Sequence, residues 1–410
     1  KTEKKIKKRK FIQMSLQLER GYCEIDNSKI KVSPGSVYGN RVTKFNTDSE
    51  DDTMLVFANN ASLYVATHSN KSEDKMEDND NKEMTKHDKI PIPIPFEKSP
   101  MVNLIKTSWN DNLEKDEICE VDSDKNRRLL AAINRSGYTS VYKYSEGSES
   151  SPIDRKDEDL PSQKRKLKHQ GFSVCTTFSN IPKFKCSIDP DHASIKFVPN
   201  SNAIATAHRF SRQIKFLDLE KQMEFKAIDT QSHINTIHPL CSNTIAVAEH
   251  NRMVVYDIRE KPSEVVGNNT SKHCFNRITN EAMWQHEEIH SIANCKSNGY
   301  SIAFSGSERS VQLIDQRNWT ISYKWQSALK YDVNYIDIVG DLCVAVGFTH
   351  PEIRAAYFSK NTSGQSIHAP SRFIGSTGIY ATGNDKKPAR LDVITVDGEI
   401  YSLNKIESSI

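Results

Sequence analysis

The chain has 410 residues, 36% hydrophobic and 27% charged, enough to bury one large core or two to three smaller ones. The mean hydropathy is −0.63, and no run approaches the roughly 20 consecutive apolar residues of a membrane-spanning helix, so we expect no membrane partner. The net charge is +3, but residues 1–10 alone contain seven Lys or Arg against Glu3, and the other 400 residues sum to −3. This distribution excludes a uniformly cationic body that coats nucleic acid.

The basic segment KTEKKIKKRK (1–10) is expected to be a disordered tail, and a second basic cluster, KRKLKH, lies at 164–169. Clusters of this kind are read by nuclear import receptors. The residues concerned are Lys7, Lys8, Arg9, Lys10, Lys164, Arg165 and Lys166. We expect a nuclear location, with a cytoplasmic one as the alternative, although a solvated charge run also explains each cluster. The absence of an apolar leader predicts no secretory route, and the absence of an initiator Met predicts that the natural chain begins upstream.

The next segment, FIQMSLQLER (11–20), has the period-2 pattern of a half-buried strand. Its apolar side chains alternate with polar ones. The apolar positions are Ile12, Met14, Leu16 and Leu18. We therefore predict a strand here.

Short strand-turn-strand units then recur, with β-branched and apolar runs separated by Asn, Asp, Gly or Ser. The clearest unit, HEEIHSIANCKSNGYSIAFSGSERSVQLIDQR (286–317), indicates three successive strands. The seven units are 53–68, 117–145, 192–221, 233–260, 286–317, 333–359 and 389–404. Such recurrence predicts a repeat architecture with few helices.

These units resemble the WD repeats of the β-propeller family, in which each repeat runs from a His-led loop through strands A, B and C to a Trp-Asp or equivalent pair. The matching pairs are Leu217-Asp218, Tyr256-Asp257 and Ile314-Asp315. The resemblance implies an all-β, seven-bladed β-propeller that spans 11–410 as a single domain. Arg309 stands where strong repeats have Asp, and Ile314 where they have Trp, so the repeats are degenerate. A two-domain all-β fold therefore remains an alternative.

The spacing of the units predicts three insertions, near 69–100, 146–170 and 261–285. Between the expected ends of strand C, three spacings are 39, 42 and 47 residues, near the roughly 40–45 of the family, and the other three are longer. We place each insertion between strands C and D, so all three should protrude from one face. Because the last unit ends at its third strand, we expect 11–20 to supply the fourth and close the ring.

HEEIH (286–290) matches the HExxH pattern of zinc proteases, which requires a helix to bring both histidines to one metal. In a strand, residues four apart are about 13 Å apart, too far to share a zinc ion. Because this segment leads directly into a predicted strand, we interpret it as structural. The eight cysteines contain no CxxC pair, and no nucleotide-binding or hydrolase motif occurs. We expect a non-catalytic protein without a metal, cofactor or small-molecule substrate.

The predicted turns between strands B and C are rich in Arg, although the body of the chain is slightly acidic. In a propeller these turns lie on the top face with the D–A connections. The candidate partner-binding residues are Arg135, Arg209, Arg252, Arg309 and His350. Arg is suited to bidentate contacts with carboxylates and phosphates, so we interpret this set as a surface for an acidic peptide, a phosphate or nucleic acid. Polar turns that favour any charged residue are the simpler explanation.

Two consecutive units end in Asp-x-Arg, at YDIR (256–259) and IDQR (314–317). This resembles the double WDxR box of propellers that serve as substrate receptors of cullin-type ubiquitin ligases, where the Arg faces an adaptor. The resemblance implies adaptor contacts by Asp257, Arg259, Asp315 and Arg317. Both copies lack the Trp, and an Arg that caps a turn explains them equally.

The overall expectation is a scaffold or adaptor subunit that binds other proteins within a multiprotein assembly of the nucleus. A rigid disc with freely varying loops offers several binding faces. Trp284 and Trp319 are candidate anchors, although packing in the core also explains them. The alternatives are a nucleic-acid-binding propeller that uses the basic tail and the top face, and a ubiquitin-ligase substrate receptor.

Overall fold

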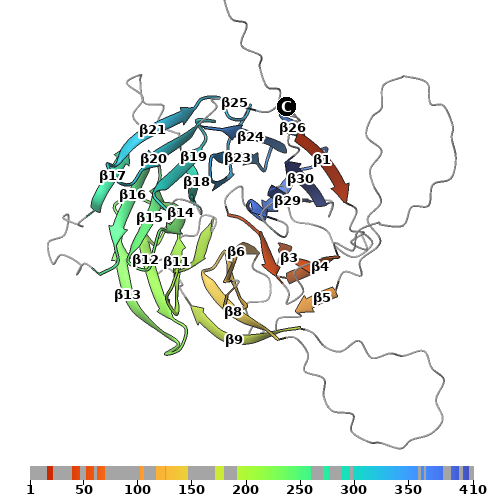
Figure 1. The fold of residues 1–410 in the computed structure, drawn as a ribbon. Coiled ribbons are helices and arrows are strands. Elements are labelled where there is room, and N and C mark those ends of the chain that lie inside the picture. The colour runs from red at the N-terminus through yellow and green to blue at the C-terminus, as the bar shows by residue number, and fades with distance from the viewer. Residues whose placement is uncertain are drawn as a thin grey trace, which may run out of the picture.

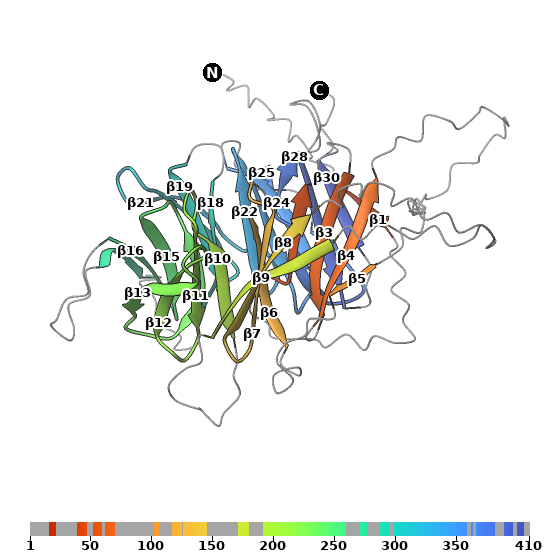
Figure 2. The same cartoon turned by 90° about the horizontal axis from the view of Figure 1, so that it is seen from below.

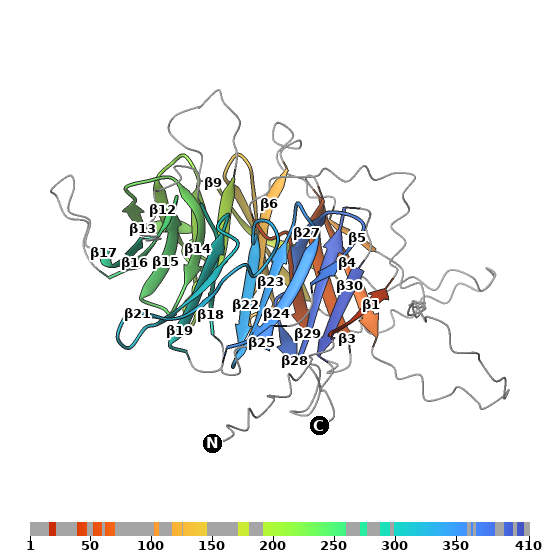
Figure 3. The ribbon, with the colours of Figure 1, turned by 90° about the horizontal axis from the view of Figure 1, so that it is seen from above.

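The computed structural model is all-β and shows a ring of seven small sheets (Figure 1). It describes residues 16–21, 39–46, 52–59, 62–69, 102–105, 117–124, 126–145, 171–179, 192–259, 271–276, 288–295, 299–358, 362–363, 366–381, 389–396 and 400–405. Seen edge-on, the strands of each sheet run between the two faces of a disc (Figures 2 and 3). No helix within these ranges is long and apolar enough to cross a membrane. The predicted seven-bladed propeller is confirmed.

Each blade is an antiparallel sheet of strands A to D, with A innermost. Blades 1 to 3 are β2 (Val42–Asn46), β3 (Asp52–Asn59), β4 (Ser62–Ser69) and β5 (Val102–Ile105); β6 (Ile118–Asp124), β7 (Leu129–Asn134), β8 (Tyr138–Ser145) and β9 (Gly171–Ser179); and β10 (Ala193–Phe197), β11 (Ala203–His208), β12 (Gln213–Asp218) and β13 (Met223–Asp229). Blades 4 and 5 are β14 (Ile234–Pro239), β15 (Thr244–Glu249), β16 (Arg252–Asp257) and β17 (Ser271–Asn276); and β18 (Ile289–Asn294), β19 (Ser301–Gly306), β20 (Val311–Asp315) and β21 (Thr320–Trp325).

The last two blades depart slightly from this plan. Blade 6 has β22 (Tyr335–Val339), β23 (Leu342–Gly347), β24 (Glu352–Tyr357) and two short outer pieces, β25 (Thr362–Ser363) and β26 (Ile367–His368), while blade 7 has β27 (Phe373–Ser376), β28 (Tyr380–Ala381), β29 (Ala389–Thr395), β30 (Ile400–Lys405) and β1 (Leu16–Gly21). The N-terminal β1 pairs antiparallel with the C-terminal β30, from Leu16 opposite Lys405 to Gly21 opposite Ile400. The predicted closure of the ring by an N-terminal strand is therefore confirmed, and it joins both ends of the chain in one sheet (Figure 1).

The core lies between the blades. Within the described residues, seven buried apolar clusters each combine side chains of two adjacent blades, so every sheet is covered on both faces. Strand B is consequently apolar without alternation: Leu130–Ile133 and Ala203–His208 are buried throughout. The outer strand β13 is instead half-exposed, with Met223 and Phe225 more than 50% exposed. This inner-to-outer gradient explains why the units appear as short apolar runs.

The three pairs that match Trp-Asp mark the ends of strand C correctly: strands β12, β16 and β20 end at Asp218, Asp257 and Asp315. One predicted boundary differs. The range 261–285 is not a single insertion, because β17 (Ser271–Asn276) lies inside it as the fourth strand of blade 4. The sequence Ser-Lys-His-Cys-Phe-Asn is an outer strand with few apolar residues, so its hydrophobic pattern is weak.

The described part of HEEIH, residues 288–290, is not helical. Strand β18 begins at Ile289, and His290 is a buried strand residue. Glu288 precedes the strand, while His286 and Glu287 lie outside the described residues. The described part of this segment therefore enters a strand, as predicted, and it lacks the helical geometry that the zinc-protease motif requires.

Polar side chains of the inner strands join neighbouring blades. At each of the seven junctions a side chain bonds a group of the next blade. The pairs are Asn40 with the backbone of Ser376, Thr43 with Ser123, Glu120 with Ser194 and Ile195 N–H, Ser194 with Ile237 N–H, Asn235 with Ile289 C=O, Ser291 with Ile336 N–H, and Asp337 with Ile379 N–H. Strand A is the inner edge of each sheet, so some of its backbone groups have no neighbouring strand to pair with. Most of these bonds satisfy such groups.

Candidate functional site

The top face carries the B–C turns and the D–A connections of all blades. Its inner rim is built from two repeated positions, the residue just before strand A and the first residue of the B–C turn. A backbone bond joins the two positions in each of several blades: Arg135 N–H donates to Glu117, Arg209 to His192, His250 to His233, and Ser307 to Glu288. Charged and imidazole side chains therefore gather on this part of the rim because blades 2 to 5 project them from the same two positions.

At blades 1 and 2 the rim holds a buried ion pair. The Arg41 guanidinium lies 2.6 Å from the Glu117 carboxylate, and their side chains are 2% and 10% exposed. Arg135 approaches the same carboxylate at 3.7 Å. The ring of His208, from blade 3, lies with Nε2 2.9 Å from the Arg135 carbonyl. This part of the rim is a closed electrostatic network, so it contributes rigidity more than accessible charge.

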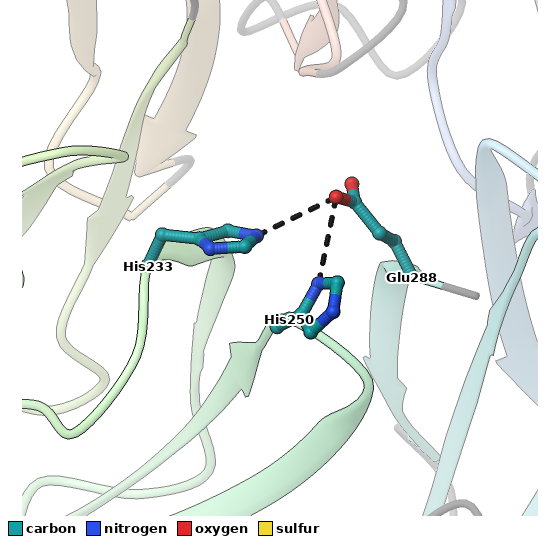
Figure 4. Close-up of side chains that lie close together, drawn as sticks. All are labelled: His233, His250 and Glu288. Carbon is teal, nitrogen blue, oxygen red and sulfur yellow. Dashed lines mark ion pairs between the residues drawn. The ribbon is translucent and has the colours of Figure 1, made fainter. Parts of the chain in front are cut away.

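At blades 4 and 5 the rim brings His233, His250 and Glu288 together (Figure 4), and Arg209 of blade 3 pairs with Glu288. Arg209 Nη2 donates to Glu288 Oε1 at 2.9 Å. The same oxygen lies 3.4 Å from His233 Nε2 and 3.5 Å from His250 Nδ1. The two imidazole rings are 4.6 Å apart between centroids. Among the described residues this is the group whose geometry fits a metal ion.

At blades 5 and 6 the top face is aromatic and cationic. The Tyr331 ring, 42% exposed, stacks on His350 at a centroid distance of 3.7 Å. Lys330 Nζ lies 5.4 Å from the centre of the Tyr331 ring. Arg309, with a φ of +65° in its B–C turn, donates to the Lys330 carbonyl at 3.2 Å. We call Arg309, Lys330, Tyr331 and His350 the aromatic-cationic cluster.

The structure brings the five predicted top-face residues to the same face but not into one basic ring. Arg135 pairs with Glu117, Arg209 with Glu288, and Arg252 with Glu249 at 2.7 Å. Arg309 and His350 alone share a patch. Carboxylates thus compensate three of the four guanidinium groups. The sequence does not reveal this, because two of the carboxylates lie on other segments of the chain and the third, Glu249, lies at the buried end of a strand.

The two Asp-x-Arg pairs lie on the opposite face, at the ends of β16 and β20. In both, the guanidinium group folds back on its own Asp: Arg259 bonds Asp257 at 2.8 Å and Arg317 bonds Asp315 at 2.6 Å. Both Arg side chains are 65% exposed. Hydrogen bonds from Arg317 lower the pKa of Asp315. The two pairs place similarly held, exposed Arg side chains on adjacent blades, although Asp257 is more buried than Asp315.

Other predicted residues are structural or fall outside the description. Trp319 has a φ of +57° and packs against a buried cluster of blades 4 and 5, which favours a role in the core. Trp284 and both basic clusters, 1–10 and 164–169, lie outside the described residues. Sequence reasoning missed Glu288, His233 and Tyr331. Glu288 and His233 carry one detectable signal, because each directly precedes an A strand, as the His-led loop of a repeat does.

Three rim histidines make stability depend on pH. Burial, followed by the charge of Arg209, lowers the pKa of His192 to about 3. Burial also lowers the pKa of His208 and, together with the charge of His233, that of His250. These rings are therefore neutral in the fold at neutral pH. The unfolded chain takes up protons below about pH 6.5, where the fold still excludes them.

We expect the free energy of unfolding to fall by several kcal/mol as the pH drops from 6.5 toward 3, because each pH unit between the two pKa values of His192 is worth about 1.4 kcal/mol. Urea unfolding at pH 7.5, 6, 5 and 4 measures this. The variant His192→Gln should flatten the dependence. An equally steep loss in that variant would show that other groups cause it.

No protein-family model matches the chain, and no curated protein matches it in sequence. Solved structures match in fold. The chain is similar to the crystal structure of Raptor from Chaetomium thermophilum, with a TM-score of 0.56 and 9% identity over 93% of this chain and 30% of that one. It is also similar to a chain of the Mitotic Checkpoint Complex, with a TM-score of 0.57 and 11% identity over 92% and 94%. The chain thus spans less than a third of the Raptor chain, and at these identities the likeness concerns the fold.

Proposed function

We propose that this chain is a non-catalytic scaffold or adaptor of the WD-repeat type that binds other proteins through its top face. The observation that carries the proposal is the aromatic-cationic cluster of Arg309, Lys330, Tyr331 and His350, which lies exposed on the turns of two adjacent blades. Tyr and Arg dominate the binding energy of protein interfaces. A solved structure with the same fold belongs to a named multiprotein complex, which supports the same role here.

The charge pattern favours a protein partner over nucleic acid. A nucleic-acid surface needs several cations that neutralise phosphates, and here carboxylates already pair with Arg135, Arg209 and Arg252. A patch with one compact group of cations around an aromatic ring fits an acidic and aromatic stretch of a partner protein instead. We further propose that the partners belong to a nuclear assembly, on the sequence of the clusters at 1–10 and 164–169.

A second candidate function is capture of a ligase adaptor by the opposite face. It is favoured by the matching geometry of Arg259 and Arg317, which are equally exposed and held by their own aspartates on adjacent blades. Because each guanidinium is already paired, an adaptor would have to supply contacts that outweigh or extend these bonds. Partners that depend on this face would be unaffected by changes at Tyr331 and His350.

We expect the double variant Tyr331→Ala with His350→Ala to lose its partners, with a drop in affinity of at least about 10-fold, because the ring stack and its cation contact disappear together. The measurement is quantitative co-purification of the tagged chain from its native cells, with partners identified by mass spectrometry. The control is Ile321→Ala, which removes a side chain 51% exposed on the outer strand β21. Retention of every partner by the double variant would place the interface elsewhere.

A further inference from the structure

We propose that His233, His250 and Glu288 form a binding site for a divalent transition-metal ion, Zn²⁺ above all, on the inner rim of the top face (Figure 4). The site is independent of the partner surface proposed above, because it belongs to blades 4 and 5 and shares no residue with the aromatic-cationic cluster. Two imidazoles and one carboxylate are a known donor set for zinc, with further positions left to water or another ligand.

The donor atoms are spaced as ligands of one ion. With zinc bonds of about 2.0–2.1 Å at tetrahedral angles, two ligand atoms are about 3.3–3.4 Å apart. Glu288 Oε1 lies 3.4 Å from His233 Nε2 and 3.5 Å from His250 Nδ1, and all three donor atoms fall within 4.8 Å of one another. Two of the three distances between donor atoms already match those of a zinc site. An ion therefore needs only small side-chain rotations to bind.

The same distances are long for hydrogen bonds, and the contact of His250 with Glu288 is at most a weak one. Charge-assisted bonds between imidazole and carboxylate are typically about 2.7–2.9 Å long. His233 Nε2 and His250 Nδ1 are both shielded from solvent and make no hydrogen bond within the described part of the chain. Buried nitrogens without a partner are costly, and a metal ion supplies the missing partner to both at once. This second observation is independent of the spacing of the cluster.

The chemistry of the donors selects the kind of ion. Ca²⁺ and Mg²⁺ require mostly oxygen ligands, whereas imidazole suits Zn²⁺ and its neighbours. Arg209, which donates to Glu288 Oε1 at 2.9 Å, orients the carboxylate in the way that outer hydrogen bonds orient metal ligands. Its charge also opposes cations that bind by electrostatic attraction alone, which further favours metals that bond strongly to nitrogen.

The site would join three segments of the top face. His233 lies in the connection that leads into β14, His250 in the B–C turn of blade 4 with a φ of +53°, and Glu288 in the connection that leads into β18. The side chains are 26%, 29% and 15% exposed, so the cluster lies near the surface although its two donor nitrogens are shielded from solvent. A bound ion would therefore fix blades 4 and 5 to each other at the rim.

The test is titration of the purified, chelator-treated full chain with Co²⁺ as a spectroscopic probe, followed by competition with Zn²⁺. We expect one tightly bound equivalent in the wild type, with the absorption of a nitrogen and oxygen site, and no displacement by Mg²⁺ or Ca²⁺. The variants His233→Ala, His250→Ala and Glu288→Gln should each weaken binding at least about 10-fold. The matched control, His350→Ala, removes an imidazole from the equivalent turn of blade 6 and should bind as the wild type does.

A thermal melt of each protein with and without Zn²⁺ separates loss of the site from loss of the fold. Zn²⁺ should raise the Tm of the wild type and of His350→Ala, and should not change that of Glu288→Gln, whose side chain keeps the shape of Glu. The proposal is overturned if the three site variants bind Co²⁺ as tightly as the wild type. It is also overturned if the absorption shows thiolate ligands, because the chain has eight cysteines that would then be the true donors.

Discussion

The variant Glu120→Ala should lower the free energy of unfolding by about 3–5 kcal/mol, because it removes the buried carboxylate that pairs with the Lys196 ammonium and leaves two further donors without their acceptor. Glu120 is 3% exposed and accepts bonds from Ser194 Oγ, Ile195 N–H and Lys196 Nζ at 2.5, 2.9 and 2.5 Å. All three donors belong to blade 3, whereas Glu120 belongs to blade 2. Burial by itself lowers the pKa of Lys196, but Glu120 and Asp122 outweigh it and raise that pKa, so the ammonium stays charged.

Urea unfolding at pH 7.5 measures the effect, and the chain provides a matched control. Glu224 and Lys215 form the same kind of pair at 3.3 Å on the outer part of blade 3, where the side chains are 42% and 20% exposed. Glu224→Ala should cost less than about 1 kcal/mol. Adding Lys196→Met to Glu120→Ala should recover part of the loss, since the ammonium group that lost its paired carboxylate is then absent. A small effect of Glu120→Ala alone would mean that the junction of blades 2 and 3 does not depend on this carboxylate.

The variant Gly306→Ala should destabilise the protein by about 3 kcal/mol, at the upper end for an overpacked site. Gly306 ends β19, opposite Ile289 in β18. A Cβ atom at this position would lie 1.9 Å from the Glu288 carbonyl oxygen and 2.9 Å from the Ile289 Cα. Both are backbone atoms of the inner strand, so the strand itself must shift and no side-chain rotation relieves the contact.

Thermal and urea unfolding of Gly306→Ala should be compared with Gly299→Ala. Gly299 has a φ of +66° and no atom within 4 Å of an added Cβ, so its substitution carries the cost of the backbone conformation alone, about 1 kcal/mol. If the two variants lose the same stability, the close approach at Gly306 is relieved by a shift that costs little. Gly306→Ala should also weaken metal binding, because the displaced backbone carries Glu288.

The propeller was predictable because its signal is local. The strands of each blade appear in the sequence as short apolar runs, and the ends of strands β12, β16 and β20 follow directly from the pairs at Asp218, Asp257 and Asp315. The closing strand was predictable for the same reason, since alternation in 11–20 is a property of adjacent residues. Strand β17 was missed because an outer strand packs little apolar surface, and its sequence resembles that of a loop.

The site could be predicted only in part, because its contacts join blades. The sequence shows that Arg209 and His250 occupy turns, but not that Glu288, 79 and 38 residues further on, lies between them. In the same way it shows the acid Glu120 in a strand without showing that the next blade needs it. Arginines in the turns appear free to bind a partner when only the sequence is considered. In the closed ring a carboxylate from another blade can pair with them, as Glu288 does with Arg209.

The most direct test of the proposed role is affinity purification of the tagged full chain from its native cells at low and high salt, with mass spectrometry and a nucleic-acid assay on each eluate. The proposal predicts stoichiometric protein partners that persist at high salt, because a packed aromatic interface is screened little by ions. Recovery of nucleic acid that disappears as salt rises, without a stable protein partner, would contradict it and favour a phosphate-binding surface.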